Sequence, residues 1–460
     1  MKKVQILHTN DIHSNYESFL RIASKIKQLK DEQTIILDAG DFNDFSSYIT
    51  KGNKGYTGLK MLCDLGYSAL TIGNNEGFQD DELITYTAKY NLINILSINL
   101  FKLDDSRVEG VKKSIIVNSN GYRFLIIGVS PFHESYNQFY KFHNVKAIEP
   151  YQLIEKELKD NKNEYDFVIL LSHLGLKTDI LLTQVVKGID VIIQGHSHHV
   201  VDCVKVNGVY LHQSGYKGSH LGELNLLIDN NKIVGVTDKN HYIDETIPQE
   251  KGLLEFYNQQ IEQAKINLSY IVCELNKDLT YKIDQECDFT NLVCDYLYSK
   301  YQCDFSMLNS GLTANNLSKG KVTYKEILTV CNSPLQIAYI EVLGKHIKSA
   351  IKASCSKEKC YDDYRRAGFR GTFLGKLHVS YNVKIDKNVE DIDIYINNEL
   401  IEQEKYYKII TTDYFLRGMG YEMLINNQNG LMFKETIVEA IINALNDQKS
   451  FDKQNTKRWR

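Results

Sequence analysis

Residues 4–14 read VQILHTNDIHS and join an apolar segment directly to a polar one, a pattern that indicates the fold of the first half of the chain. VQIL has the composition of a short buried strand, and Asp11, Ile12 and His13 follow where that strand ends. Side chains at positions i and i+2 of an extended chain point to the same side. Asp11 and His13 therefore offer a carboxylate and an imidazole to one point, although such a pair alone is weak evidence for a metal site.

The same arrangement recurs along the first half of the chain. Short apolar strands followed by glycine and polar residues are TIILDAGD (34–41), LTIGNNE (70–76), FVILLSHLG (167–175) and DVIIQGHSHH (190–199). Residues 17–30 carry apolar side chains at the spacing of one helix face. This alternation favours an α/β layered fold, in which ligands collect at the carboxyl ends of the strands.

Each polar cluster has an ordinary explanation when it stands alone. Gly-Asp and Gly-Asn-Asn are common turn sequences, and a single histidine after a strand is often a hydrogen-bonded core residue. The clustered histidines of GHSHH (195–199) need a further reason. Five clusters in this order, all at strand ends, predict a metal site whose ligands are Asp11, His13, Asp41, Asn74, His173, His196 and His198.

The ligand atoms of this set are carboxylate or amide oxygens and imidazole nitrogens. Such atoms suit Mn, Zn, Fe, Co or Mg, and the absence of cysteine from the set argues against a soft-metal site. Seven ligands are too many for one ion but suit two ions that share a bridging carboxylate. We therefore expect two divalent ions and a metal-bridging hydroxide that acts as a nucleophile.

The length of 460 residues predicts two domains. We place a catalytic domain at 1–245, a polar linker helix at 246–275 and a second domain at 276–460. The pattern of the second domain predicts helices at 289–300, 344–354 and 434–446 and strands at 304–309, 376–383 and 406–411. The last ten residues, FDKQNTKRWR, are expected to be solvated.

Composition excludes several classes of function. A net charge of −4 argues against a nucleic-acid partner, which would recruit a basic surface. No run of about 18 apolar residues occurs, so we expect no membrane partner. The N-terminus lacks the apolar core of a secretory signal, which predicts a cytoplasmic protein with nine reduced cysteines. A structural zinc at Cys355 and Cys360 is disfavoured because no second pair completes it, and no obligate protein partner is evident.

The motifs LHTNDIHS (7–14), AGDF (39–42), GNNE (73–76), SHLG (172–175) and GHSHH (195–199) resemble those of the calcineurin-like metallophosphoesterases. More narrowly, they resemble the 5′-nucleotidase and 2′,3′-cyclic-nucleotide phosphodiesterase family, and a signal-less cytoplasmic bacterial branch is the most similar. LNSG (308–311), GTFLGKL (371–377) and TTDYFLRGMGY (411–421) are similar to that family's C-terminal substrate domain. The resemblance implies a four-layer metallophosphoesterase β-sandwich flanked by helices, followed by an α+β substrate-recognition domain.

The resemblance also implies individual roles. Asp11, His13 and His198 would bind one ion, and Asn74, His173 and His196 would bind the other. Asp41 would bridge both ions, and Asn75 would lie beside the reacting phosphate as a catalytic residue. The implied substrate contacts are a nucleobase clamp of Phe373 and Tyr421, with Asn309 and Gly311 near the nucleoside.

Two positions depart from the family pattern. The family usually carries histidine where this chain has Asn75, and an amide can donate a hydrogen bond but cannot act as a cationic acid. The family also shows an arginine after the Asn-x-Gly segment, where this chain reads NSGLTA (309–314). Arg370 and Arg417 are the candidates to replace it.

The expected function is metal-dependent hydrolysis of nucleotides, with nucleoside 5′-monophosphates as the leading substrates. A 2′,3′-cyclic-nucleotide or other nucleotide phosphodiesterase uses the same metal site and remains an alternative. An alternative of another class is a catalytically silent nucleotide-binding or regulatory protein, which Asn75 and the missing arginine favour. The complete ligand set argues against that alternative, because a silent protein has no chemical need to keep it.

Overall fold

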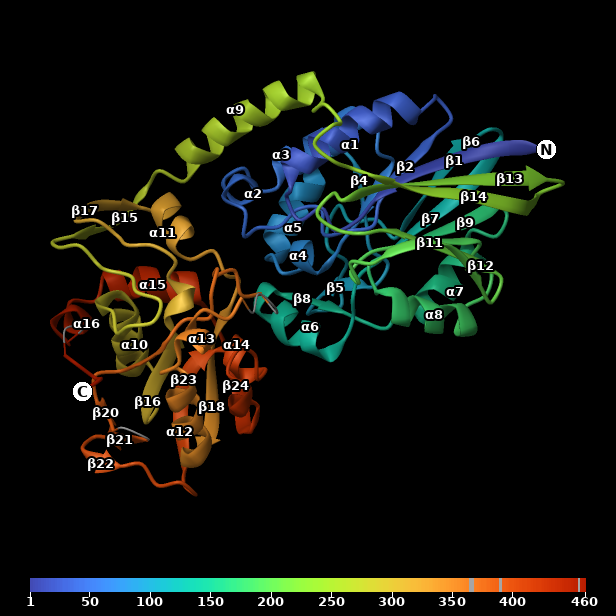
Figure 1. The fold of residues 1–460 in the computed structure, drawn as a ribbon. Coiled ribbons are helices and arrows are strands. Elements are labelled where there is room, and N and C mark those ends of the chain that lie inside the picture. The colour runs from blue at the N-terminus through green and yellow to red at the C-terminus, as the bar shows by residue number, and fades with distance from the viewer. Residues whose placement is uncertain (364–367, 389–390, 454–455) are drawn as a thin grey trace. The chain divides into compact units, whose positions relative to one another are not determined.

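The computed structural model describes residues 1–363, 368–388, 391–453 and 456–460 (Figure 1). It contains two compact units, Met1–Lys265 and Ile266–Arg460. None of the helices in the described residues is both long and apolar enough to cross a membrane. All nine cysteines lie in the described part of the chain, and none forms a disulfide.

The first unit contains two six-stranded sheets. The first has the order β14 (Lys232–Tyr242), β13 (His220–Asp229), β1 (Lys2–Thr9), β2 (Ile35–Asp38), β3 (Ala69–Thr71) and β4 (Asn94–Leu96). The second has the order β11 (Val200–Val206), β12 (Val209–Ser214), β10 (Val191–Gln194), β9 (Phe167–Ser172), β7 (Tyr122–Val129) and β6 (Ser114–Ser119). Strands β1 to β4 pair in parallel, as do β7, β9 and β10, so their carboxyl ends lie along common edges.

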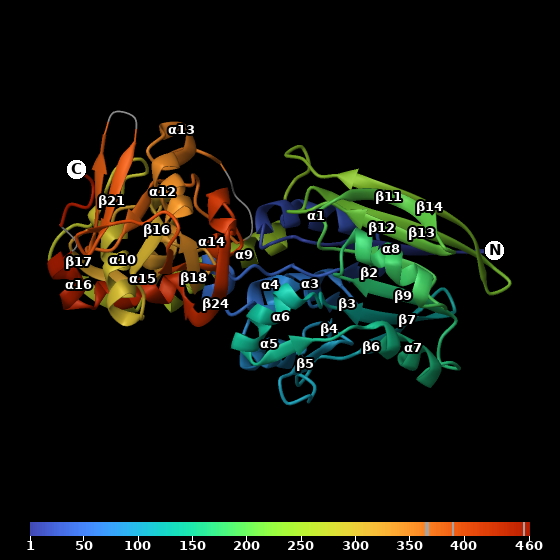
Figure 2. The ribbon, with the colours of Figure 1, turned by 90° about the horizontal axis from the view of Figure 1, so that it is seen from below.

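The two sheets pack face to face, with helices outside them. Val4 and Ile6 of β1 are buried in the core between the sheets, whereas Leu7 is buried in the core under the helices. This alternation is expected for a strand with both faces covered. Helices α1 (Tyr16–Leu29) and α3 (Tyr56–Leu65) lie on one side of the sheets, and α7 (Tyr151–Asp160) and α8 (Leu176–Val185) lie on the other (Figures 1 and 2). The four layers implied by the sequence are confirmed.

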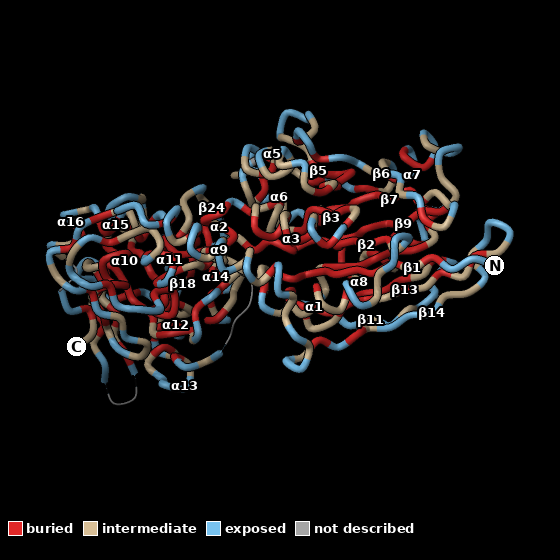
Figure 3. The backbone as a smooth tube through the Cα atoms, turned by 90° about the horizontal axis from the view of Figure 1, so that it is seen from above, coloured by how far each residue is buried: buried red, intermediate tan, exposed pale blue. Residues whose placement is uncertain are grey.

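Burial separates the layers from the loops around them. Figure 3 shows the central strands of both sheets, such as β2 and β9, as buried segments, whereas the edge strands β11 and β14 and many connecting loops are intermediate or exposed. The remaining small elements of this unit are α2 (Tyr48–Gly52), α4 (Asn74–Gly77), α5 (Asp81–Lys89), β5 (Leu100–Lys102), α6 (Glu134–Tyr140), a 3-10 turn at Lys141–His143 and β8 (Val145–Ala147).

The second unit is built on a five-stranded mixed sheet. Its order is β19 (Leu377–Val379), β16 (Phe305–Asn309), β23 (Tyr406–Thr412), β18 (Gln336–Leu343) and β24 (Asn427–Thr436). The three predicted helices are present as α10 (Asp288–Lys300), α12 (Gly344–Ala353) and α15 (Ile437–Leu445). The smaller elements are α11 (Tyr324–Val330), α13 (Lys357–Cys360), α14 (Asp413–Leu416), α16 (Gln448–Lys453) and a three-stranded sheet of β20 (Val383–Lys387), β21 (Ile392–Ile396) and β22 (Glu399–Leu400).

The predicted linker is too long at its C-terminal end. The linker helix is α9 (Lys251–Asn267), but β15 (Ile271–Leu275) pairs with β17 (Gly320–Thr323) inside the second unit. Cys273 and Leu275 are buried there, on the same face of the strand. The second unit therefore includes residues 271–275, which the sequence pattern assigned to the linker.

The expectation of a solvated C-terminal tail is confirmed for Asp452, Thr456, Lys457 and Arg460, which are exposed, but is wrong for Arg458. Residues 454 and 455 of that tail lie outside the described part of the chain, but Arg458 is fully buried. Its Nη2 lies 2.6 Å from Oδ2 of the buried Asp295. The backbone around Arg458 also pairs with Ile385, which donates to the Arg458 carbonyl at 2.7 Å. A buried carboxylate gives the guanidinium a partner, which is what allows a charged side chain into the core.

Candidate metal centre

The predicted ligands all follow the carboxyl ends of strands in the first unit. Asp11 and His13 follow β1, Asp41 follows β2, and Asn74 begins α4 after β3. His173 follows β9, and His196 and His198 follow β10. Because β1, β2 and β3 belong to one sheet and β9 and β10 to the other, the ligands come from both sheets of the sandwich.

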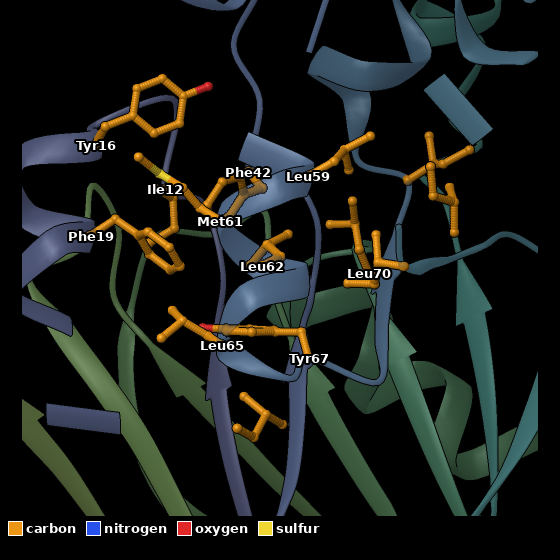
Figure 4. Close-up of a cluster of buried hydrophobic side chains, with 14 of the residues drawn as sticks. Ile12, Tyr16, Phe19, Phe42, Leu59, Met61, Leu62, Leu65, Tyr67 and Leu70 are labelled. Carbon is orange, nitrogen blue, oxygen red and sulfur yellow. The ribbon is translucent and has the colours of Figure 1, made fainter. Parts of the chain in front are cut away.

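Buried apolar side chains fix the loops that carry the ligands. Ile12, between Asp11 and His13, is 1% exposed, and Phe42, directly after Asp41, is fully buried. Both belong to the core cluster of Figure 4, which also contains Phe19 and Met61. The apolar residue in each loop is thus held by the core, and the polar residue beside it is turned toward the centre.

The ligand loops have an unusual backbone conformation. Positive φ angles occur at Asp11 (51°), His13 (50°), Asp41 (54°), His196 (72°) and His198 (60°). L-residues rarely adopt this region, and each instance costs of order 1–3 kcal/mol, which the surrounding structure must offset. Strain of this kind is concentrated at functional sites, and here it falls on five of the seven predicted ligands.

Glycines next to the ligands leave room for their side chains. At Gly40, whose φ is 90°, a Cβ atom would lie 2.7 Å from Nδ1 of His173. At Gly195 a Cβ atom would meet the same nitrogen at 2.6 Å. Both glycines are therefore required for His173 to reach the centre.

One group of ligand atoms combines Asp11, His13 and His198, whose ligand atoms lie within 4.8 Å of one another. Nε2 of His198 is 3.4 Å from Oδ1 of Asp11, and Nε2 of His13 is 3.8 Å from the same oxygen. The two imidazole nitrogens are 3.3 Å apart. This group corresponds to the first of the two predicted ion sites.

A second group combines Asp11, Asp41 and His173, again within 4.8 Å. Oδ2 of Asp41 lies 3.4 Å from Nε2 of His173 and 3.9 Å from Nε2 of His13. One oxygen of Asp41 therefore faces an imidazole from each predicted ion site. Oδ1 of Asp11, which belongs to both groups, does the same, since it also lies 3.7 Å from Nε2 of His173.

Two buried ligand atoms are orphaned within the described part of the chain. Nε2 of His173 and Oδ1 of Asn74 have no hydrogen-bond partner there. Nδ1 of His173 lies 2.6 Å from the carbonyl oxygen of Ala39, to which it donates, so Nε2 is the ring nitrogen left for a metal once its proton is lost. A buried polar atom without a partner is costly, and a divalent ion bound to both atoms removes that cost. The donor set therefore fits a metal centre.

The charged groups of the metal centre shift one another's pKa values. Burial opposes protonation of His173, but the carboxylates of Asp41 and Asp11 outweigh it and raise the pKa of the imidazole to about 10. Burial would raise the pKa of Asp41, yet the charge of His173 holds that pKa below its usual value. Burial and the neighbouring His173 lower the pKa of His196 to about 4.

His196 is oriented by two contacts. Its backbone N–H donates to Oδ2 of Asp11 at 2.8 Å. Its Nε2 lies 2.9 Å from the hydroxyl of Tyr136, on α6. The structure thus brings the His196 backbone to the carboxylate of Asp11, while Nε2 of the ring is occupied by a tyrosine.

Three residues around the centre were missed by the sequence interpretation. Glu76 accepts hydrogen bonds from the backbone N–H groups of Asp41 (3.0 Å), Asn43 (2.9 Å) and Gly73 (3.1 Å), and burial followed by the charge of Asp41 raises its pKa well above the usual value. A glutamate at the third position of a helix is a capping signal that the GNNE motif contained. Tyr136 contacts His196, and the ring of Tyr216 stacks on His198 at 4.8 Å. No local sequence signal points to either tyrosine.

The predicted substrate residues of the second unit behave differently from one another. Phe373 is half-buried and has its ring 5.3 Å from that of the exposed Tyr361. Tyr421 is fully buried, and its hydroxyl donates to the carbonyl of Gly375 at 2.7 Å. The Tyr421 ring has no exposed face against which a nucleobase could stack. Tyr421 is therefore a core residue in this conformation, and its interpretation as one side of a nucleobase clamp is corrected.

Asn309 and Gly311 are also buried. The Asn309 amide donates to the carbonyl of Leu374 at 2.5 Å, while its Oδ1 has no partner within the described residues. A Cβ at Gly311 would collide with the carbonyl oxygens of Phe373 and Leu374. Both residues therefore fix the backbone that carries Phe373.

Of the two candidate arginines, Arg417 pairs with Asp413 and Arg370 is exposed.

Comparisons with known proteins agree with this geometry. Residues 4–200 match the calcineurin-like phosphoesterase family, and residues 271–425 match the 5′-nucleotidase C-terminal domain. The chain is 27% identical to an uncharacterised metallophosphoesterase of Bacillus subtilis, YunD, over 92% of this chain and 94% of that protein. It is 24% identical to a 5′-nucleotidase of Diplobatis ommata, over 93% of this chain and 84% of that protein. In fold it is similar to the NAD nucleotidase of Haemophilus influenzae, with a TM-score of 0.64 at 17% identity over 100% of this chain and 97% of that one.

Proposed function

Because the chain belongs to the calcineurin-like metallophosphoesterases, carries a 5′-nucleotidase C-terminal domain and hydrolyses phosphoric esters, we propose that its substrates are nucleotides, with nucleoside 5′-monophosphates first among them. The observation that carries the nucleotide assignment is the match of residues 271–425 to a domain named for nucleotidases. Relatives that extend over most of the chain are named 5′-nucleotidases, including one of Bos taurus that is 23% identical over 92% of this chain.

The proposal includes two divalent ions. His13, His198 and Asp11 would hold one, Asn74, His173 and His196 would hold the other, and Asp41 would contact both. The orphaned Oδ1 of Asn74 and Nε2 of His173 support the second ion in particular, because neither buried atom has a hydrogen-bond partner among the described residues. Bound divalent ions polarise phosphoryl oxygens and activate water for attack on phosphorus.

The protein residues would supply positioning. Asn75 holds both oxygens of Asp41, through its backbone N–H at 2.8 Å and its side-chain amide at 2.9 Å. Asn10 holds Asp11 at 2.8 Å, and the Ala39 carbonyl holds the His173 ring. Preorganisation of this kind lowers the reorganisation needed when charge develops on the phosphoryl group. Asn75 is also the proposed donor beside the reacting phosphate.

We assign recognition of the nucleoside to the second domain. Phe373 is the proposed contact, because it is the predicted substrate residue whose ring is partly accessible. Stacking of a base on one aromatic ring contributes about 1–3 kcal/mol at single-stranded nucleic-acid sites. An interaction of that size would distinguish a nucleotide from an aryl phosphate of similar reactivity.

The test is phosphate release by metal-stripped protein to which Mn, Zn, Mg or Co has been added back. The substrates are nucleoside 5′-monophosphates, 2′,3′-cyclic nucleotides, dinucleotides and a generic aryl phosphate. We expect metal-dependent turnover of a 5′-monophosphate with kcat/KM well above that of the aryl phosphate.

The other outcomes separate the alternatives. Preference for cyclic nucleotides or dinucleotides would identify a phosphodiesterase at the same metal site. Turnover of the aryl phosphate alone would reject the nucleotide assignment and leave the metal chemistry standing. Two bound ions without any turnover would identify a silent binding protein.

A further inference from the structure

We infer that Tyr136 is a positioning residue of the metal centre, which sets the tautomer of His196 and thereby selects Nδ1 of that imidazole as its metal-binding atom. The inference rests on the proposed function only in requiring an ion beside His196. Tyr136 is on α6, outside every motif that predicted the ligands.

The side chains of Tyr136 and His196 are in direct contact. The tyrosine hydroxyl lies 2.9 Å from Nε2, within hydrogen-bond reach, and the two rings meet edge to face at 5.6 Å. A neutral imidazole carries its hydrogen on one nitrogen and its lone pair on the other. If the hydroxyl accepts the Nε2–H, the lone pair lies on Nδ1. If the hydroxyl donates to Nε2, Nδ1 carries the hydrogen and has no lone pair for a metal.

Only the first arrangement is compatible with metal binding while the Tyr136 contact is kept. A metal-ligating histidine generally donates its other ring N–H to an acceptor, which fixes the tautomer and the orientation of the ring. The neighbouring His173 is held through its other ring nitrogen. Its Nδ1–H donates to the Ala39 carbonyl at 2.6 Å and leaves Nε2 as the orphaned buried atom. The two histidines of the second ion site therefore present different ring nitrogens.

The surroundings of Tyr136 hold the hydroxyl in place. Asn137, the next residue, donates to the carbonyl of Ala147 at 2.9 Å and accepts from the N–H of Ala147 at 2.9 Å, which fastens α6 to β8. The Tyr136 ring lies 5.9 Å from Phe78 and 6.3 Å from Tyr140. These contacts fix the side chain independently of His196, as a positioning role requires.

The matched variants are Tyr136→Phe and Tyr140→Phe. Both remove one hydroxyl from the same helix, but the Tyr140 hydroxyl faces the Pro131 carbonyl at 3.5 Å. The first readout is nitrogen-15 NMR of histidine-labelled, metal-free full-length protein, which distinguishes the two tautomers of a neutral ring. We expect His196 to carry its hydrogen on Nε2 in the wild type and in Tyr140→Phe, and to be a mixture of tautomers in Tyr136→Phe.

The second readout is calorimetric titration of the same metal-free proteins with Mn²⁺ alone. Loss of a hydrogen-bonding partner of a metal ligand costs about 10- to 100-fold in metal affinity, so we expect that loss for one of two ions in Tyr136→Phe and for neither in Tyr140→Phe. Hydrogen on Nδ1 of wild-type His196, or an unchanged Mn²⁺ isotherm in Tyr136→Phe, would overturn the inference. Wild-type protein that binds two ions without hydrolysing any nucleotide would reject the proposed substrates and leave the role of Tyr136 intact.

Discussion

The side-chain amide of Asn75 donates a hydrogen bond to Oδ2 of Asp41 at 2.9 Å, and the backbone N–H of Asn75 donates to Oδ1 of the same carboxylate at 2.8 Å. Asn75 stands where the family usually has histidine. The side chain at this position is therefore a neutral amide and not an imidazole that can carry a proton. Its side chain also lies 2.8 Å from Nδ1 of His13. In this chain Asn75 therefore contacts two predicted metal ligands, Asp41 and His13.

Replacement of Asn75 by alanine removes the side-chain donor but keeps the backbone bond to Asp41. We expect kcat to fall by about 10²-fold, the lower end of the effect of removing one transition-state donor, with metal content unchanged. Steady-state kinetics with metal analysis checks this result, and Asn118→Ala on the exposed face of β6 is the control. Full activity in Asn75→Ala would show that this amide has no part in the reaction.

Replacement of Asp41 or His196 by alanine should remove metal and activity together. Asp41 faces imidazoles of both predicted ion sites, so its loss should leave fewer than two ions per chain. Elemental analysis and phosphate release on the same samples measure the two effects. Asp104→Ala, in an exposed turn, should change neither. A variant of Asp41 that keeps both ions and full turnover would contradict the ligand assignment.

Metal binding should release protons from His173. In the metal-free protein the pKa of this imidazole is raised to about 10, so the ring is charged at pH 7.5. A metal binds only the neutral ring, and we therefore expect about one proton released from His173 per chain and tighter Mn²⁺ binding as pH rises toward 9. Calorimetry in buffers of different ionisation enthalpy counts the protons.

The same shift has a consequence for the stability of the metal-free protein. A histidine whose pKa is higher in the folded than in the unfolded state stabilises the fold fully below about pH 6.5, and this contribution is lost as pH rises through about 10. Denaturant unfolding of metal-free protein should therefore give a lower midpoint at pH 9.5 than at pH 7. A midpoint that rises over this interval would have the wrong sign.

Phe373 and Tyr421 should respond differently to truncation. Phe373→Ala should raise KM for a nucleotide and leave the aryl phosphate unaffected, while Phe433→Ala, another half-buried ring of the second unit, should change neither. Tyr421→Ala should destabilise the protein by about 3–5 kcal/mol, the usual cost of removing a large buried ring. Kinetics with both substrates and denaturant unfolding separate the two effects. A nucleotide-specific KM change in stably folded Tyr421→Ala would restore the clamp.

Arg458 should be important for stability although it is the third residue from the end of the sequence. Arg458→Met leaves the buried Asp295 carboxylate without its cation, which costs about 3–5 kcal/mol when a buried pair is broken. Unfolding in denaturant measures the loss, and Arg460→Met is the control. The double variant Asp295→Leu with Arg458→Met should recover part of the stability, because it removes both charges.

The layered fold, and the position of each proposed ligand after a strand, could be predicted from the sequence because they depend on local patterns. Each ligand sits directly after a strand, and a strand is read from a short apolar run. The apolar residues Ile12 and Phe42, which anchor the ligand loops, are likewise visible in the motifs. The burial of Tyr421 and Arg458 could not be read in this way, because an aromatic or a basic residue in a loop has the same local sequence whether it is exposed or packed.

The amino-acid sequence thus indicated which side chains are candidate metal ligands and at which end of the strands they lie, because each follows a short apolar run that forms a buried strand. How these side chains are held depends on the packing of the whole domain. Tyr136 reaches His196 across 60 residues, Ala39 reaches His173 across 134, and Glu76 binds three backbone N–H groups in two loops. The bond between Glu76 and Gly73 is a local capping contact that the GNNE motif contains, but the other contacts join segments far apart in the chain. They depend on how the sheets and helices pack, and no local pattern in the chain encodes them.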